Sequence, residues 1–370
     1  MKLLASLLAL SLLAQSPLFA EELSFYIGTY TRPGGSEGIY RGVLDTDTGS
    51  ARITGLAGVA KNPSFLAISP GGKFLYAAIE DAGGMVGAFV INADGTLKAL
   101  NSESSKGSGN CHVSVDDSGR NVFAANYGSG TIACLPIKAD GSLAPASASI
   151  QHEITSPDGL RKKAPHAHAI CQNGAFVYAC DLGANQVFIY KFDASKGVLT
   201  PNDPKSARLP EGSGPRHLAF RPQGGFAFVN NETTCEITSF AHDAAKGTLT
   251  AVHTLSTLPV DYTLTGKDST AEIQCHPNGR FVYVSNRGHD SIAVFSIATD
   301  GKLTRVQVAD AHAKIPRGFA LSPDGKWLIA AGQSSDTLAL HQLDPATGLL
   351  TFKNIIGKVG APVNVEFLKP

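Results

Sequence analysis

The chain has 370 residues, 43% of them apolar, and carries 31 basic and 31 acidic side chains, so its formal charge is zero. A chain without net charge gives no sign of the basic surface with which proteins bind nucleic acids or anionic membranes, so neither partner is predicted. The length suffices to bury a large core, in one big domain or two ordinary ones, without support from disulfides.

The first 20 residues are typical of an export signal. Lys2 precedes an apolar run over residues 3–13, and Ala20 ends a cleavage site with Leu18 three places before the cut. The run is too short to span a bilayer comfortably, and no later segment reaches about 18 apolar residues. We therefore predict a signal peptide over residues 1–20 and an exported domain, periplasmic or secreted, over residues 21–370. An uncleaved membrane anchor is the alternative.

Two repeated units alternate along the rest of the chain. The first is a glycine-bearing turn before an apolar residue, as in "NADGTLKAL" and "DPATGLLTF". It occurs seven times at spacings of 46 to 56 residues, with its glycines at Gly49, Gly95, Gly141, Gly197, Gly247, Gly301 and Gly348. Repeats of this length are typical of solenoids and propellers.

The second unit is a hairpin of two alternating strands around a turn that contains glycine. Six copies occupy residues 65–78, 112–125, 168–180, 217–230, 272–285 and 319–331. The seventh copy is divided between the two ends of the chain. Residues 25–30 ("FYIGTY") match the second strand of the hairpin, and residues 363–368 ("VNVEFL") match the first.

Each repeat supplies four strands, which predicts an all-β fold, a seven-bladed β-propeller with four-stranded blades. One C-terminal strand and three N-terminal strands should close the first blade, since this arrangement removes exposed sheet edges. Two β-sandwiches are the alternative, but they would not explain why one unit is divided. No helix-length amphipathic pattern is present.

The repeats depart from their own pattern at one end of the predicted blades. The residues predicted to open the innermost strands are Ser64, His112, His166, Arg216, Ala271 with Glu272 beside it, Arg317 and Val363. Those predicted to follow the second strands are Tyr127, Leu182, Glu232, Arg287 and Gln333. Ordinary turns favour Gly, Asn, Ser and Asp. Because symmetry places equivalent positions in a ring, we predict that these charged side chains meet at the mouth of the central channel.

The segments around these residues resemble the seven-bladed propeller lactonases, a family that includes propeller-type bacterial 6-phosphogluconolactonase and a fungal carboxy-muconate lactonising enzyme. The matching segments are "PHAHAI", "GPRHLAF" with "VNNE", "AEIQCHPNGRFVYVSNRGHDSIAVF" and "PRGFALSPDGKWLIAAGQSSDTL". The resemblance covers the whole mature chain. It implies a lactonase, a carboxylic ester hydrolase of carbohydrate metabolism, whose catalytic residues are His168, Arg216, Glu232 and Arg287.

Further residues are expected to bind the substrate: His166, His112, Glu272, Arg317 and Gln333. His166 is also the rival of His168 for the catalytic role, since the two are spaced i, i+2 and should share one face of a strand.

Hydrolysis of a lactone needs an activated water molecule and a place for the charge on the carbonyl oxygen. Glu232 or His168 is expected to accept the proton of the water. Arg216 and Arg287 are expected to stabilise the oxyanion or to hold an anionic group of the substrate. No serine nucleophile elbow or catalytic cysteine pair is present, so we predict direct attack by water.

No metal or other cofactor is predicted, because the sequence has neither a carboxylate cluster nor Cys/His zinc spacing. The six cysteines are expected to be buried free thiols, and Cys171 should face Phe176 across its hairpin rather than pair with Cys180.

Two alternatives stay open on the sequence alone. Arg216, Glu232 and Arg287 can form an ion network that only ties blades together. The chain can also be an exported binding or scaffolding module without activity. The predicted partner is a small-molecule lactone, whereas the particular lactone and the oligomeric state are not predicted.

Overall fold

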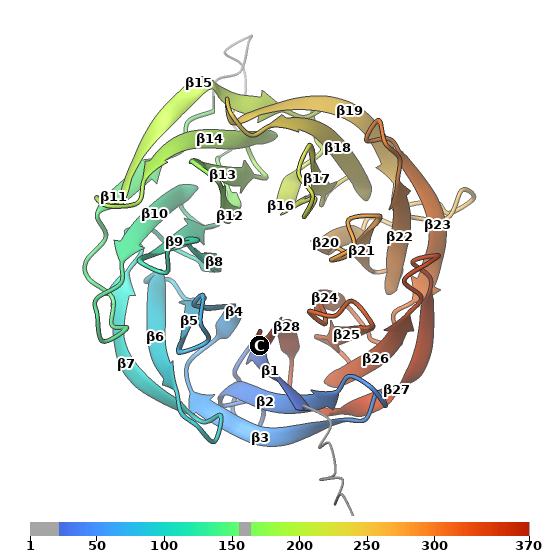
Figure 1. Ribbon diagram of the computed structural model, residues 1–370, viewed down its shortest axis with the longest axis horizontal. Helices are drawn as coiled ribbons and strands as arrows, with labels where there is room; N and C mark the ends of the chain where they lie inside the picture. The colour runs from blue at the N-terminus through green and yellow to red at the C-terminus, as the bar shows by residue number, and fades with distance from the viewer. Residues whose placement is uncertain (1–21, 155–163, 370) are drawn as a thin grey trace, which may run out of the picture.

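The computed structural model describes residues 22–154 and 164–369, so the predicted signal peptide lies outside the described residues. Within those ranges the chain forms 28 strands and no helix, hence no helix long and apolar enough to cross a membrane. The strands build seven antiparallel sheets of four strands each. Figure 1 shows the sheets arranged around a central axis as the blades of a propeller. The predicted fold is confirmed.

Each blade extends from an innermost strand beside the axis to an outermost strand at the edge of the disc. In this order, blade 1 contains β28 (Pro362–Phe367), β1 (Glu22–Thr29), β2 (Gly38–Asp45) and β3 (Ala51–Val59). Blade 2 contains β4 (Pro63–Ile68), β5 (Phe74–Ile79), β6 (Met85–Ile91) and β7 (Leu97–Ser104). Blade 3 contains β8 (Asn110–Val115), β9 (Asn121–Asn126), β10 (Thr131–Pro136) and β11 (Ala148–Gln151). Blade 4 contains β12 (Ala167–Asn173), β13 (Phe176–Asp181), β14 (Gln186–Asp193) and β15 (Val198–Arg208).

The remaining three blades repeat the same order. Blade 5 contains β16 (Pro215–Phe220), β17 (Phe226–Asn231), β18 (Glu236–Asp243) and β19 (Thr248–Ser256). Blade 6 contains β20 (Ser269–Cys275), β21 (Phe281–Arg287), β22 (Ser291–Ile297) and β23 (Leu303–Asp310). Blade 7 contains β24 (Pro316–Leu321), β25 (Trp327–Gly332), β26 (Thr337–Leu343) and β27 (Leu350–Lys358).

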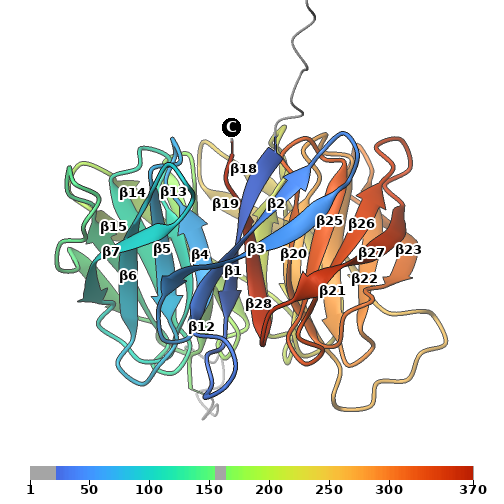
Figure 2. The same ribbon diagram turned by 90° about the horizontal axis from the view of Figure 1, so that it is seen from below.

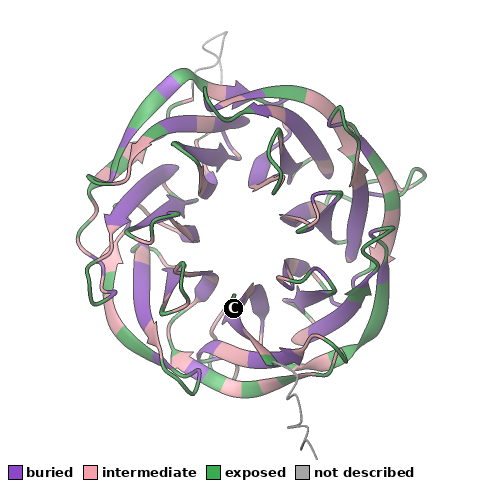
Figure 3. Cartoon of the chain, viewed as in Figure 1, coloured by how far each residue is buried: buried purple, intermediate pink, exposed green. Residues whose placement is uncertain are grey.

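Burial decreases from the inside of each blade to the outside. The second strands are mostly buried, and β9 and β13 are buried along their whole length, which explains why they read as nearly continuous apolar runs. The outermost strands carry many exposed polar residues, as in β7 and β27. Figure 3 shows this gradient, with buried residues on the inner strands and exposed ones along the outer edge.

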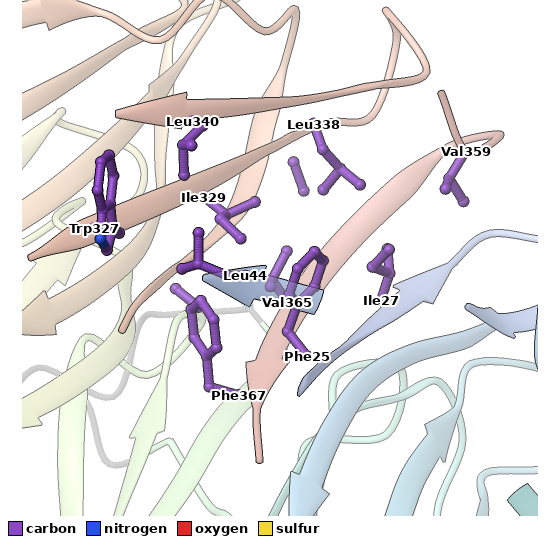
Figure 4. Close-up of a cluster of buried hydrophobic side chains, with 12 residues drawn as sticks. Phe25, Ile27, Leu44, Trp327, Ile329, Leu338, Leu340, Val359, Val365 and Phe367 are labelled. Carbon is purple, nitrogen blue, oxygen red and sulfur yellow. The ribbon is translucent and has the colours of Figure 1, made fainter. Parts of the chain in front are cut away.

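The ring is closed within blade 1, as the divided repeat predicts. β1 pairs with β28 from Phe25↔Phe367 to Thr29↔Pro362. Phe25 and Phe367 pack edge to face, with ring centroids 5.6 Å apart. Together with Val365 they belong to a buried cluster that reaches Trp327 and neighbouring residues of blade 7 (Figure 4). The first and last blades therefore share one apolar core.

The repeated turn glycines fasten each blade to its neighbour. All seven have positive φ, between 62° and 85°, a conformation that favours glycine. At Gly49, a Cβ atom would collide with the indole ring of Trp327, which comes from the preceding blade. The same close approach joins Gly141 to Phe74, Gly247 to Phe176, Gly301 to Phe226 and Gly348 to Phe281. The repeat thus encodes both the turn and the contact between blades.

All seven innermost strands begin at the same face of the disc, which we call the mouth. β1 begins and β28 ends at the other face, so the ends of the described chain lie opposite the mouth. In Figure 2 the C-terminus is at the upper face and the mouth is the lower one.

Candidate active site

Each innermost strand carries an extra residue near its start. The pairing with the second strand skips one position there, which is the signature of a β-bulge. The bulged residues of blades 1 to 7 are Val363, Ser64, Cys111, His168, Arg216, Ala271 (with Glu272) and Arg317. We call them the bulge ring. Bulges re-aim side chains locally and are frequent beside active sites.

A second ring follows the second strands at the same face. In the first blade, the Tyr30 N–H donates to the Ala361 carbonyl (3.1 Å), and the corresponding bond recurs in blades 2, 3, 4, 5 and 7. In blade 6, Arg287 pairs with Ser269 instead. The residues of this rim ring are Tyr30, Glu80, Tyr127, Leu182, Glu232, Arg287 and Gln333. A common backbone bond therefore aligns residues that are about 50 positions apart in the sequence.

Two residues assigned from the sequence to the bulge positions are elsewhere. Blade 3 has Cys111 rather than His112, because its hairpin turn begins at Asp116, whose N–H donates to the Asn121 carbonyl. Blade 4 has His168 rather than His166. The predicted strand starts were counted backwards from the hairpin turns. In blade 4 the turn after Asn173 is only two residues long, so this count gives the wrong position.

The expectation that His166 and His168 share one face of a strand is also wrong. β12 begins only at Ala167, and the bulge at His168 breaks the regular alternation. His166 is half-buried and stacks on the Tyr127 ring, at a centroid distance of 4.5 Å. His168 is buried and meets the same ring edge to face, at 5.5 Å. Cys171 was also expected to face Phe176, but the two-residue turn lies at Gly174-Ala175, one residue later than the expected Asn173-Gly174, and Cys171 faces Tyr178. The six cysteines, all among the described residues, are free thiols as expected, but Cys171 and Cys275 are only partly buried.

Glu232 lies between two arginines, and we call the three residues the charged triad. Glu232 Oε1 is 3.0 Å from Arg287 Nη2, and Glu232 Oε2 is 2.9 Å from Arg216 Nε. Arg216 Nη1 also donates to the carbonyl oxygen of Ala271, and Arg287 Nη2 to that of Thr270 at 3.0 Å. The sequence comparison predicted that these three side chains meet, and the structure brings them together from blades 5 and 6.

The charged triad retains unused hydrogen-bonding capacity. Among the described residues, eight buried side-chain atoms lack a hydrogen-bond partner, and three of them are Arg216 Nε, Glu232 Oε2 and Arg287 Nε. Arg216 Nε and Glu232 Oε2 are close together but are not aligned for a hydrogen bond. In a purely structural network such atoms are normally satisfied. This concentration favours a binding role over a network that only ties blades together.

The three members of the charged triad differ in burial and electrostatics. The side chain of Arg216 is 3% exposed, that of Arg287 14% and that of Glu232 22%. Burial alone would raise the pKa of Glu232, but the charges of Arg216 and Arg287 outweigh it and hold this pKa below its usual value. Burial lowers the pKa of Arg216 to about 10, so Arg216 stays charged at neutral pH. The mouth therefore presents a carboxylate and two guanidinium groups.

His168 is the histidine that faces the charged triad. Its Nε2 lies 3.8 Å from Glu232 Oε2. Burial, followed by the charge of Arg216, holds the pKa of His168 well below its usual value, so the imidazole is neutral. Its other nitrogen, Nδ1, is 3.8 Å from Cys111 Sγ. Burial raises the pKa of the Cys111 thiol to about 12, which makes this cysteine a poor nucleophile.

Beneath the charged triad, a second set of polar side chains lines the channel. Arg216 Nη1 donates to His217 Nε2 at 3.2 Å. The proton of this imidazole must then lie on Nδ1, which is 3.2 Å from Glu272 Oε1. His112 packs edge to face against His217, with centroids 5.3 Å apart, and stacks on Phe65 at 4.3 Å. His112 and Glu272, both predicted to bind substrate, thus lie deeper than the mouth.

The burial of Glu272 predicts a pH-dependent stability. Burial raises the pKa of Glu272 to about 7, whereas the unfolded chain titrates near pH 4.3. The folded state therefore holds the proton more tightly, and its advantage is lost as the pH rises from about 4 through 7. Between pH 5 and 8, the wild type should lose about 2–3 kcal/mol more unfolding free energy than Glu272→Gln.

Urea unfolding of both proteins at pH 5, 6, 7 and 8 measures this difference. The buried histidines are present in both proteins, so the comparison isolates the carboxyl group. Parallel pH profiles would contradict the raised pKa.

Sequence comparison missed three residues of this region. Tyr30 and Glu80 occupy rim positions in blades 1 and 2, and the Tyr30 hydroxyl donates to Glu80 Oε2 at 2.8 Å. Both follow second strands at the same repeat position as Glu232, so the alignment of repeats contained the signal. His217 directly follows Arg216, and only the bulge turns both side chains towards the channel. Gln333 lies on the rim ring and Arg317 on the bulge ring, as expected.

No group of three or more His, Cys, Asp or Glu side chains within residues 22–154 and 164–369 could hold a metal ion. The site consists of arginine, glutamate and histidine side chains around the axis of a seven-bladed propeller. Such a fold and site are typical of a propeller that binds a polar small molecule at one end of its channel.

Comparison with known proteins identifies the family. The chain belongs to the lactonases with a seven-bladed β-propeller, whose family model matches residues 24–367. It is 36% identical to 6-phosphogluconolactonase from Bacillus subtilis, over 93% of this chain and 97% of that protein. It is 32% identical to 6-phosphogluconolactonase from Serratia proteamaculans, over 77% and 82% of the two chains.

Solved structures agree with this family. A protein from Lactobacillus plantarum has a TM-score of 0.86 at 32% identity and covers 94% of this chain and 100% of its own. A periplasmic gluconolactonase from Pseudomonas aeruginosa has a TM-score of 0.84 at 29% identity, with 94% and 99% covered. The resemblance noted in the sequence and the assignment as a lactonase are therefore confirmed.

Proposed function

We propose that the chain hydrolyses a sugar lactone of the gluconolactone type to the open hydroxy acid, at the mouth of its central channel. The observation that carries this proposal is the charged triad beside a neutral histidine, with buried polar atoms left without partners. The names of the relatives support the substrate class, since they include 6-phosphogluconolactonases and a gluconolactonase.

We assign the role of proton acceptor to His168. Both oxygens of Glu232 already face arginines, at 2.9 and 3.0 Å, whereas the neutral imidazole of His168 keeps a lone pair on one ring nitrogen. Water attacks the carbonyl carbon while His168 takes one of its protons. The imidazolium that forms is stabilised by Glu232, whose Oε2 is 3.8 Å from His168 Nε2.

The arginines stabilise the negative charge that develops during the attack. As the C=O bond becomes a C–O⁻ bond, guanidinium groups at the mouth donate charged hydrogen bonds to the oxyanion. Arg287 is the more exposed of the two and Arg216 the more buried. When the tetrahedral species collapses, the ring C–O bond breaks, the leaving oxygen takes the proton from His168, and the hydroxy acid is released.

A pH-stat assay of the purified protein tests this function. Acid release is followed from glucono-δ-lactone and from its 6-phosphate, and the spontaneous rate is subtracted. We expect kcat/KM of at least about 10⁴ M⁻¹s⁻¹ for one of them. Rates equal to the background for both lactones would contradict the proposal and leave the non-catalytic binding module as the better hypothesis.

Export stays a proposal that the sequence of residues 1–20 motivates. The description of the Pseudomonas aeruginosa relative as periplasmic supports it. Mass measurement of the mature protein, expected to begin at Glu21, tests it.

A further inference from the structure

Arg317 is an arginine of the mouth that lacks an acidic partner. It is half-buried in the bulge ring of blade 7. Among the described residues, no carboxylate oxygen forms an ion pair with it within 4.0 Å. Its guanidinium group lies over the Tyr30 ring, 5.5 Å from the centroid. This contact orients the cation from one face and does not occupy its N–H donors.

The repeat itself shows why this charge is unbalanced. Blade 5 has an arginine in the bulge ring and a glutamate in the rim ring, Arg216 and Glu232, which form an ion pair. Blade 7 has the same arrangement with Arg317 and Gln333. The position that would neutralise Arg317 thus holds a neutral amide of nearly the same shape. Blade 7 keeps a positive charge where blade 5 has cancelled it.

Neighbouring acids do not remove this excess. Glu232 is shared between Arg216 and Arg287, and Glu80 Oε2 accepts the hydroxyl proton of Tyr30. The bulge and rim rings together contain three arginines and three glutamates, but Glu272 lies deeper in the channel against His217, so three arginines and two glutamates remain at the mouth itself. A cleft with a surplus of one sign attracts ligands of the other. An unpaired guanidinium is suited to bidentate binding of phosphate, and the rim position of the same blade adds an amide donor.

We propose that Arg317 and Gln333 bind the phosphate ester of a phosphorylated sugar lactone, in the blade next to the charged triad. This inference rests on the proposed function and adds to it the part of the substrate that sets specificity. Phosphate would supply the counter-charge that Arg317 lacks, while the lactone ring reaches the charged triad. The enzyme would then prefer the 6-phosphate over the unphosphorylated lactone.

Two substitutions test the subsite. Arg317→Gln removes the charge, and Gln333→Glu rebuilds in blade 7 the arginine–glutamate pair of blade 5. Each should lower the preference for gluconolactone 6-phosphate over gluconolactone, measured as the ratio of kcat/KM values, by about 10- to 100-fold. For the phosphorylated lactone, the lower kcat/KM should result mainly from a higher KM. Arg317→Lys should retain an intermediate preference, because it keeps the charge without the planar fork.

Binding of the products gives a second readout that needs no catalysis. Calorimetric titration with 6-phosphogluconate and with gluconate should show a preference for the phosphorylated acid in the wild type, and the loss of this preference in Arg317→Gln and Gln333→Glu. The matched control is Arg280→Gln, an exposed arginine in a hairpin turn at the opposite face, which should change neither ratio.

The outcomes separate this inference from the proposed function. A wild type that hydrolyses gluconolactone but neither prefers nor binds its phosphorylated form overturns the subsite and leaves the lactonase intact. Equal losses for both substrates in the variants also overturn it, because Arg317 would then serve the chemistry or the fold. If the wild type hydrolyses neither lactone, the proposed function fails and the subsite fails with it.

Discussion

Replacing Glu232 by Gln is expected to lower kcat/KM for the lactone by about 10²- to 10⁴-fold, the range for loss of a group in proton transfer. The change keeps the shape of the side chain but removes the charge that would stabilise protonated His168, 3.8 Å away. It also takes away the shared counter-ion of Arg216 and Arg287. Initial rates by pH-stat, with thermal unfolding on the same samples, measure both effects.

Glu232→Gln should also lower the thermal stability of the protein. Arg216 is 3% exposed, and a buried charge that loses its partner can cost about 3–5 kcal/mol. We expect a loss below this range, because Glu232 is 22% exposed and the mouth is open to water. The control is Glu236→Gln on β18 of the same blade, which should retain full activity. Unchanged kcat/KM in Glu232→Gln would contradict the proposed mechanism.

Replacing Arg287 by Ala should lower kcat by about 10²- to 10³-fold, as is typical when one donor to an oxyanion is removed. The fold should survive, because this side chain is 14% exposed and lies at the rim rather than beneath it. Arg216→Ala should instead reduce both activity and the melting temperature, since it leaves His217 Nε2 without its donor and the Ala271 carbonyl with Asn230 Nδ2 as its remaining side-chain donor.

Comparing these two variants separates catalysis from structure. Steady-state kinetics and circular dichroism melting curves of both proteins provide the measurement, with Arg280→Ala at the opposite face as the control. If Arg287→Ala is as active as the wild type, the charged triad serves only to join blades 5 and 6. If it unfolds like Arg216→Ala, its position at the rim has been misinterpreted.

The fold was predictable because its determinants are local and repeated. Alternating strands follow from a period of two, and turn glycines such as Gly49 follow from a backbone conformation that glycine favours. The divided repeat at the two ends predicted the pairing of β28 with β1, which the structure confirms. Repetition also brought Arg216, Glu232 and Arg287 into one cluster, since symmetry converts equal repeat positions into neighbours in space.

The details of the site depended on features that repetition does not encode. A single extra residue in each innermost strand decides which side chain enters the bulge ring, so His112 and His166 were misplaced by one and two positions. The sequence did not predict the pKa shifts either, because the raised pKa of Glu272 and the lowered pKa of His168 arise from burial by other blades.

The sequence by itself therefore determined the seven blades, their closure and the identity of most charged residues around the axis, Glu80 being the exception. These properties depend on local periodicity and on counting repeats. Only the tertiary structure decided which of these residues contact one another, which atoms remain unpaired and which arginine lacks an acid. Contacts and electrostatics depend on distances between segments far apart in the chain, and in this fold a bulge of one residue is enough to change them.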